Sequence, residues 1–248
     1  MNIPVKITPD SIRDSIIEIK YSSTIPFEVL VGFIYNALDD TYKYTNQPNP
    51  LNKNQQIALQ QGLVEFQLGV QNLFFTDTIK LDIRPNSLIF NCLNGYKGWD
   101  IYKAEIEKTL EQISKIKEIQ KYNRIGVRYI SEYSETDITN CTKFNFSFGI
   151  PNIMSDTYVF RTEFMSSDLR VILTLQHKTQ VLTGKLYNNI AETKPISIID
   201  IDVIADNLSI ESYAELLLLI DKIHTTEKEI FFNIMDEEYL KTLNPVYK

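Results

Sequence analysis

Alternating apolar and polar residues predict strands in the first half of the chain. Near the N-terminus Ile17, Ile19 and Tyr21 alternate with charged residues, which is the period of a half-buried strand. Residues 78–84 and 87–92 alternate on either side of a Pro-Asn turn, so they predict a hairpin within a meander that spans residues 62–92. A further strand is predicted over residues 124–132.

Apolar residues three and four positions apart predict the helices. One begins after Pro26, with Ser23 and Thr24 as capping residues, and a second covers residues 101–119 after Asp100. A long helix begins after the Ser212 capping box, and a shorter one covers residues 236–243. Residues 42–56 are rich in Asn, Pro and Lys and predict a loop.

The second half opens with predicted strands and closes with the two predicted helices. The strands cover residues 144–148, 157–164, 169–179 and 196–205, and residues 180–194 fit either one more edge strand or a loop. Clustered strands followed by helices predict an α+β fold, an antiparallel sheet with helices packed on one face. Residues 1–135 form a strand-helix-meander-helix-strand half, and residues 140–248 form antiparallel strands followed by the long helix. We expect one compact unit, with the halves as candidates for diverged copies.

Composition and charge narrow the class of protein. The 248 residues are 44% apolar and 23% charged, which is typical of a globular chain. The net charge of −7 and the pI near 5.0 disfavour nucleic acid as a direct partner. No apolar stretch approaches the roughly 18 residues needed to span a bilayer, and no signal peptide is recognisable. Cys92 and Cys141 are too few for a disulfide framework, so we expect reduced thiols and a cytoplasmic protein.

Sequence motifs of the common enzyme classes are missing. The segment 94–98 contains two glycines but lacks the spacing of a phosphate-binding loop. No zinc-ligand spacing and no Gly-x-Ser-x-Gly elbow occurs. We therefore assign no catalytic residue, predict no metal and no cofactor, and favour a non-enzymatic role while leaving catalysis open.

The strand predicted over residues 124–132 carries the densest polar signal. Arg124, Gly126 and Arg128 fall on one face, and Tyr129 falls on the other with Ile125 and Val127. Two arginines beside a bare glycine could hold a phosphate or a carboxylate of a ligand. Alternatively, they pair with carboxylates across the sheet.

Two aspartates and one histidine complete the candidates. Asp200 and Asp202 share one face of a predicted strand, where aspartate is uncommon. They could bind a divalent cation, or they could be the counter-ions of Arg124 and Arg128. His224 lies beside the apolar stripe of the long helix, where a packed histidine is more usual than a catalytic base.

These same residues carry a resemblance. The segments Arg124-Ile-Gly-Val-Arg-Tyr-Ile-Ser131 and Ile199-Asp-Ile-Asp202, followed by a helix with His224 and Phe231, resemble a sporadically distributed bacterial protein family of unknown function. That family is marked by an Arg-x-Gly-Leu-Arg-Tyr-Ile-Asn motif, a Leu-Asp-Ile-Asp strand and a Leu-His pair in the last helix. The chain departs from it at Val127, Ser131 and Ile223. The resemblance implies no activity, but its patchy distribution is similar to that of mobile and anti-phage defence genes.

Three functional hypotheses follow. The first is a binding protein, an accessory component of a bacterial mobile or antiviral defence module that acts through a protein partner. The second is a sensor of, or an enzyme acting on, a small phosphorylated ligand held by the arginine pair, with Tyr129 and His224 nearby. The third is a metal-dependent nuclease using Asp200 and Asp202, which the acidic pI disfavours. A homo-oligomer is compatible with all three.

Overall fold

The computed structural model describes residues 3–48, 70–134, 137–144, 157–183 and 192–247. The strands are β1 (Ile12–Ser23), β2 (Lys43–Pro48), β3 (Val70–Phe75), β4 (Ile79–Arg84), β5 (Ser87–Cys92), β6 (Ile119–Ser134), β7 (Tyr158–Ser166), β8 (Leu169–Thr183) and β9 (Glu192–Ala205). The helices are α1 (Phe27–Ala37), α3 (Trp99–Ile113), α4 (Ile138–Cys141), α5 (Tyr213–Ile234) and α6 (Glu237–Thr242).

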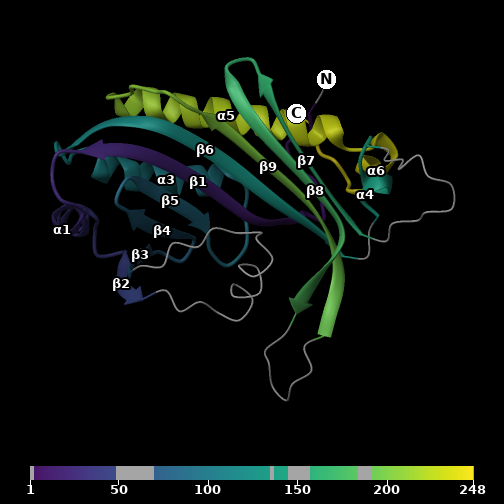
Figure 1. Ribbon diagram of the computed structural model, residues 1–248, viewed down its shortest axis with the longest axis horizontal. Helices are drawn as coiled ribbons and strands as arrows, with labels where there is room; N and C mark the ends of the chain where they lie inside the picture. Colours follow the sequence, from purple (N-terminus) through teal and green to yellow (C-terminus); the bar gives the residue numbers. More distant parts are fainter. Residues whose placement is uncertain (1–2, 49–69, 135–136, 145–156, 184–191, 248) are drawn as a thin grey trace.

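The strands form one nine-stranded sheet in the order β2-β3-β4-β5-β1-β6-β9-β8-β7. Each neighbouring pair is antiparallel. The long strands β1 and β6 lie side by side in the middle, and the sheet curves strongly around them (Figure 1). The predicted α+β fold with an antiparallel sheet is confirmed.

The topology repeats about the β1–β6 pair. Outward from β1 the sheet continues with β5, β4 and β3, and outward from β6 it continues with β9, β8 and β7. In chain order, each series is preceded by a strand and a helix and followed by a helix, with β2 as the additional strand of the first unit. This order is what two related halves would produce. The repeat begins at β6, which pairs with both β1 and β9, so one continuous sheet joins the two predicted halves.

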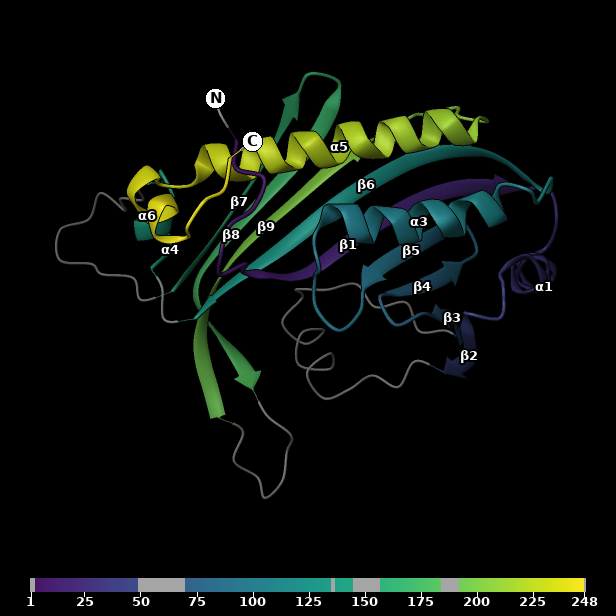
Figure 2. The same cartoon turned by 180° about the vertical axis from the view of Figure 1, so that it is seen from behind.

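Helices α3 and α5 lie against the same face of the sheet (Figures 1 and 2). The strand periodicity explains this one-sided packing. Ile125, Val127 and Tyr129 alternate along β6 and are all buried on the helix side. Helix α5 presents Ile220 and Ile223 to them from its apolar stripe.

The chain termini are joined on the same side of the molecule. Val5 donates its backbone N–H to Val246, and Val246 donates to Lys6, at 2.7 and 2.8 Å. The Asn244 side chain donates to the carbonyl of Thr8 at 3.0 Å. The segment preceding β1 is therefore fixed beside the C-terminal segment, close to α5 (Figure 1).

Several predicted boundaries are wrong, for local reasons. Part of the loop predicted over residues 42–56 is β2, because Tyr44 packs on Phe74 and donates to Asn72 across the pair with β3. Residues 49–56, and with them residues 62–69 of the meander and 145–148 of the next strand, lie outside the described residues. For residues 180–194 the sequence left an edge strand or a loop open. Residues 180–183 extend β8 and residues 192–194 extend β9, and residues 184–191 lie outside the described residues.

Two predicted helix starts lack the expected side-chain caps, and one helix is shorter than predicted. Pro26 and Gly98 hold the N-cap positions of α1 and α3 without a side-chain hydrogen bond. Helix α3 ends at Ile113, not at residue 119. Ile116 is still buried, because a turn closed by its N–H to Ile113 returns it to the core. Apolar spacing therefore continues beyond the end of the helix. No helix in the described ranges is long and apolar enough to cross a membrane.

Candidate ligand-binding site

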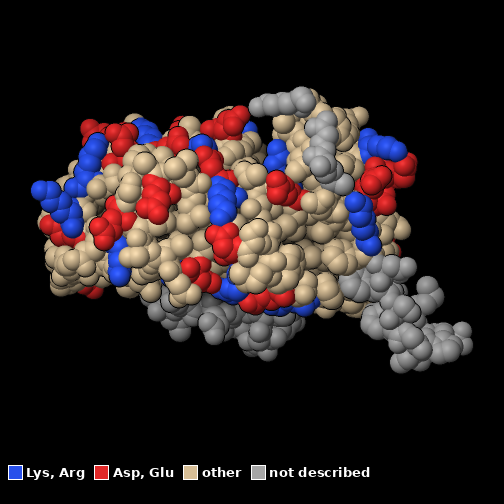
Figure 3. Space-filling model, turned by 90° about the horizontal axis from the view of Figure 1, so that it is seen from above, with Lys and Arg blue, Asp and Glu red and all other residues tan. Residues whose placement is uncertain are grey.

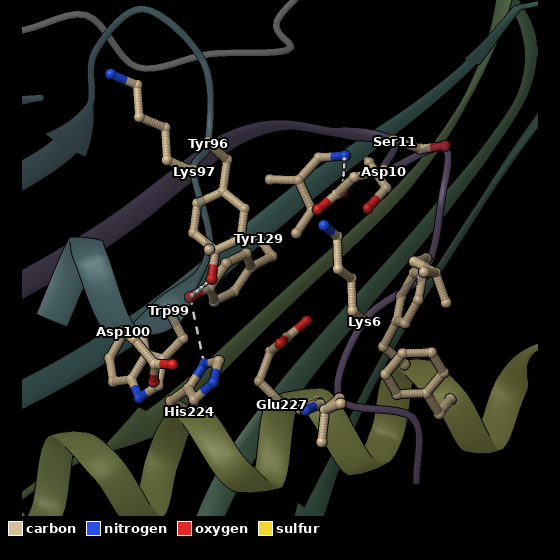
Figure 4. A pocket seen from close by; sticks show the side chains of 18 of the residues that line it. Lys6, Asp10, Ser11, Tyr96, Lys97, Trp99, Asp100, Tyr129, His224 and Glu227 are labelled. Atoms are coloured by element: carbon tan, nitrogen blue, oxygen red, sulfur yellow. Dashed lines mark hydrogen bonds between the residues drawn. The ribbon is translucent and has the colours of Figure 1, made fainter. Parts of the chain in front are cut away.

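A pocket of about 660 Å³ lies between the sheet and α5. Its base is formed by Tyr129 and Ser131 of β6. The segment before β1, the connection from β5 to α3, and α5 form its walls (Figure 4). Each wall therefore comes from a part of the chain distant in sequence from the others.

The β5–α3 connection delivers two aromatic residues. Gly95 and Gly98 have positive φ values of 87° and 101°, a conformation that glycine adopts without strain. The chain turns there and brings Tyr96 and Trp99 against the pocket. The Trp99 indole N–H donates to Asp221 at 3.3 Å, and this hydrogen bond fixes the ring against α5.

A chain of polar contacts runs across the pocket wall. The hydroxyls of Tyr96 and Tyr129 lie 3.3 Å apart, and the Tyr129 hydroxyl lies 3.2 Å from Nδ1 of His224 (Figure 4). The imidazole stacks on Trp99 with centroids 3.8 Å apart and 16° between the planes. Burial lowers the pKa of His224 to about 4, so the ring is neutral at pH 7. With its proton on Nε2, Tyr129 donates to His224, and Tyr96 donates to Tyr129.

Glu227 is the unusual residue of the pocket. It lies one turn after His224 on α5, only 5% of its surface is exposed, and its carboxyl points into the pocket (Figure 4). Among the described residues this carboxyl has no hydrogen bond and no ion pair. Burial raises its pKa to about 8, so it is mostly protonated at pH 7.

The sequence contains a signal for Glu227, although the predicted site residues do not include it. The apolar stripe of α5 includes Ile220 and Ile223 and resumes at Ile230, and Glu227 occupies the gap at helical spacing. A charged residue at such a position is buried unless the helix rotates. Tyr96 and Trp99 carry no comparable signal, because only the tertiary fold brings their segment to α5.

The predicted site residues fall on opposite faces of the sheet. Tyr129 and His224 meet in the pocket as described. Arg124, Gly126 and Arg128 point to the face without α5. Asp200 and Asp202 of the neighbouring strand β9 point to the same face, with Asp202 directly opposite Arg128. The predicted alternation along β6 is thereby confirmed.

On that other face the two arginines hold carboxylates. Arg128 forms two hydrogen bonds with Asp200, from Nε at 2.8 Å and from Nη2 at 2.6 Å. Arg124 pairs with Glu18 of β1 and, at 3.3 Å, with Asp206, which also binds Arg170. Charge pairing across the sheet is therefore the structural role of both arginines.

Asp202 and Gly126 complete this charged cluster in different ways. Asp202 makes no direct ion pair in the described part of the chain. Burial raises its pKa to about 6, although Arg124 and Arg128 act in the opposite direction at longer range. A Cβ on Gly126 would lie 3.4 Å from the Asp202 carboxylate and 3.6 Å from the Arg124 guanidinium. The glycine thus leaves room for these two side chains.

Surface charge and potential metal ligands are the two remaining features of the described residues that bear on the hypotheses. On the face crossed by α5, acidic and basic side chains are interspersed and form no patch of one sign (Figure 3). No group of three His, Cys, Asp or Glu residues with metal-binding geometry occurs within the described ranges.

The fold and the site together define an α+β protein with a pocket between one face of an antiparallel sheet and the long helix α5. Comparison with protein-family models, curated proteins and solved structures finds no match to this chain. Its function is therefore inferred from the pocket itself.

Proposed function

We propose that the protein is a binding protein that holds a small organic molecule in the pocket between β6 and α5. The observation that carries this proposal is the buried Glu227 carboxyl, which faces the pocket without a partner among the described residues. A buried polar group without a partner costs about 1–3 kcal/mol, and a ligand that binds it removes that cost. Aromatic walls with a few polar groups are the usual lining of small-molecule sites.

The arginine pair gives less support to a phosphorylated ligand. Both guanidinium groups already bind carboxylates, and they lie on the sheet face opposite the pocket. A phosphate would have to displace Asp200 from a two-point interaction with Arg128. The charged cluster is better explained as part of the fold.

Native mass spectrometry of the full chain, tagged and isolated from its own host, tests the proposal. We expect a bound small molecule at one copy per chain. Ile101 lines the pocket and is 48% exposed, so Ile101→Trp narrows it without disturbing the core. Val29 on α1 is similarly exposed, at 47%, and lies outside the pocket, which makes Val29→Trp the matched control. Loss of the ligand in the first variant alone supports the pocket. A bare wild-type chain, or a ligand retained in Ile101→Trp, contradicts it.

A protein partner is a second proposal, supported by the edge of the sheet. Strand β7 is the last strand on its side, and its Val159 and Met165 are 61% and 62% exposed. An exposed edge strand can bind an extended segment of another protein by adding it to the sheet. We expect a partner that co-purifies at fixed stoichiometry and is lost in Met165→Lys. A partner retained by that variant would exclude this edge. The setting in a defence module stays a prediction from the family resemblance.

A further inference from the structure

We propose that the ligand of this pocket is an organic ammonium ion, with the Glu227 carboxylate as its counter-ion and the rings of Tyr96, Trp99 and Tyr129 around it. This inference rests on the proposed function, since it names the chemical class that the same pocket takes. It follows from the unpaired carboxyl, from the aromatic walls and from the balance of the surrounding charges.

An ammonium group supplies the positive charge and the hydrogen-bond donors that the buried Glu227 carboxylate lacks. Only 5% of the Glu227 surface is exposed, and no described residue donates a hydrogen bond to it. An ionised carboxylate in such a place needs both an opposite charge and hydrogen-bond donors. An alkylammonium carries both in one group, and charge-assisted hydrogen bonds are about twice as strong as neutral ones.

The aromatic rings that line the pocket favour a positively charged ligand. Tyr96 and Tyr129 meet edge to face, with centroids 5.5 Å apart and planes at 85°, and both rings line the pocket. The negative faces of aromatic rings attract cations, by about 2 kcal/mol or more where water is excluded. His224 does not oppose this attraction, because its imidazole is neutral at pH 7.

Apart from those on α5, the charged residues that line the pocket are two lysines and two aspartates, so their net charge is close to zero. Lys6 and Asp10 both lie on the segment before β1 and interact with each other. Lys97 and Asp100 both belong to the wall around the start of α3.

The remaining charges belong to α5 and α3. Asp221 binds Lys103 and Trp99, and so is already engaged. Lys228 acts on Glu227 electrostatically, but less strongly than burial does. Glu227 therefore remains the acid whose charge the described part of the protein leaves uncompensated.

A neutral ligand that accepts a hydrogen bond from the protonated carboxyl is the competing possibility, and the two differ in the sign of their pH dependence. An ammonium ion selects the ionised carboxyl and releases its proton, so its affinity rises with pH up to the pKa of Glu227. A neutral acceptor selects the protonated carboxyl, so its affinity falls as pH rises through that pKa.

Isothermal titration of the full chain with phenethylamine and with 2-phenylethanol separates these cases. The two probes share a ring and a chain length and differ in their charged or neutral head. With a carboxyl pKa of about 8, we expect the amine to bind about 50-fold more tightly at pH 8 than at pH 6. At pH 7 it should release close to one proton, seen as a dependence of the heat on the buffer. The alcohol should bind at least about tenfold more weakly than the amine at pH 8.

Glu227→Gln should abolish the pH dependence and most of the amine affinity. Glu229 lies on the exposed side of the same helix, so Glu229→Gln is the matched control and should bind as the wild type does. Equal binding of the two probes, amine affinity kept in Glu227→Gln, or no amine binding at millimolar concentration would each overturn the inference. Alcohol binding that Ile101→Trp abolishes would overturn it while leaving the proposed binding function intact.

Discussion

The two faces of strand β6 differ in whether their buried charged groups are paired. On the face without α5, Arg124 and Arg128 are matched by Glu18, Asp200 and Asp206. On the face toward α5, Glu227 approaches the same strand and finds no partner among the described residues. Five candidate residues from the sequence lie on the first face, yet the pocket lies on the second.

The difference shows which polar signals point to a ligand. Charges that pair within the fold already have partners in the absence of a ligand, so they do not by themselves indicate a binding site. A buried acid left unpaired is retained at a cost to stability, and proteins accept such costs mainly at functional sites. Perturbing each face in turn tests this difference.

Removing Arg124 should have the largest effect. Its side chain is 19% exposed and pairs with Glu18 and Asp206, so Arg124→Met leaves Glu18 without its partner, while Asp206 keeps only Arg170. We expect urea denaturation at neutral pH to show a loss of about 3 kcal/mol in the free energy of unfolding. Binding in the pocket should be unchanged.

An exposed ion pair provides the control for this variant. Arg13 pairs with Glu132 at 3.2 Å, but 54% of its side chain is exposed. Arg13→Met should therefore cost no more than about 0.5 kcal/mol. Equal losses in the two arginine variants would mean that the cluster around Arg124 contributes no more than a surface pair.

The pH dependence of stability should reveal Glu227. Its pKa rises from 4.5 to about 8 on folding, so the folded chain keeps a proton that the unfolded chain has released between those values. Stability therefore falls with rising pH, by about 1.4 kcal/mol per unit, and the fall ends near pH 8.

His224 determines where this effect is visible. Its pKa falls from 6.5 to about 4 on folding, so it makes stability rise with pH between those values and offsets Glu227 there. The window from pH 6.5 to 8 isolates Glu227, and we expect a loss of about 2 kcal/mol across it. Chemical denaturation at several pH values should show this slope in the wild type and in Glu229→Gln, but not in Glu227→Gln. A parallel slope in Glu227→Gln would assign the titration to another group.

Local patterns predicted the fold well and the pocket poorly, for a physical reason. Alternation along β6 and the Ser212 cap of α5 act within a few residues, so the sequence displays them directly. The pocket depends on long-range contacts, such as Trp99 with Asp221 and the N-terminal segment with residues near Val246. The pairing of Arg128 with Asp200 was predictable because two unusual charged patterns on strands explain each other.

Asp202 gives the sharpest test of that pairing. The sequence suggested that it is a direct counter-ion, which predicts severe destabilisation on removal. In the structure it makes no direct ion pair in the described part, and burial raises its pKa from 3.8 to about 6. Above pH 6 the folded chain must ionise this buried carboxyl, which the unfolded chain ionises more readily, so the ionisation of Asp202 lowers the free energy of unfolding. Asp202→Asn should raise the free energy of unfolding at pH 7 by up to about 3 kcal/mol, with the gain vanishing near pH 4. A large loss at pH 7 would instead show that long-range attraction to Arg124 and Arg128 outweighs burial, and the face without α5 would then be more tightly coupled than its direct contacts indicate.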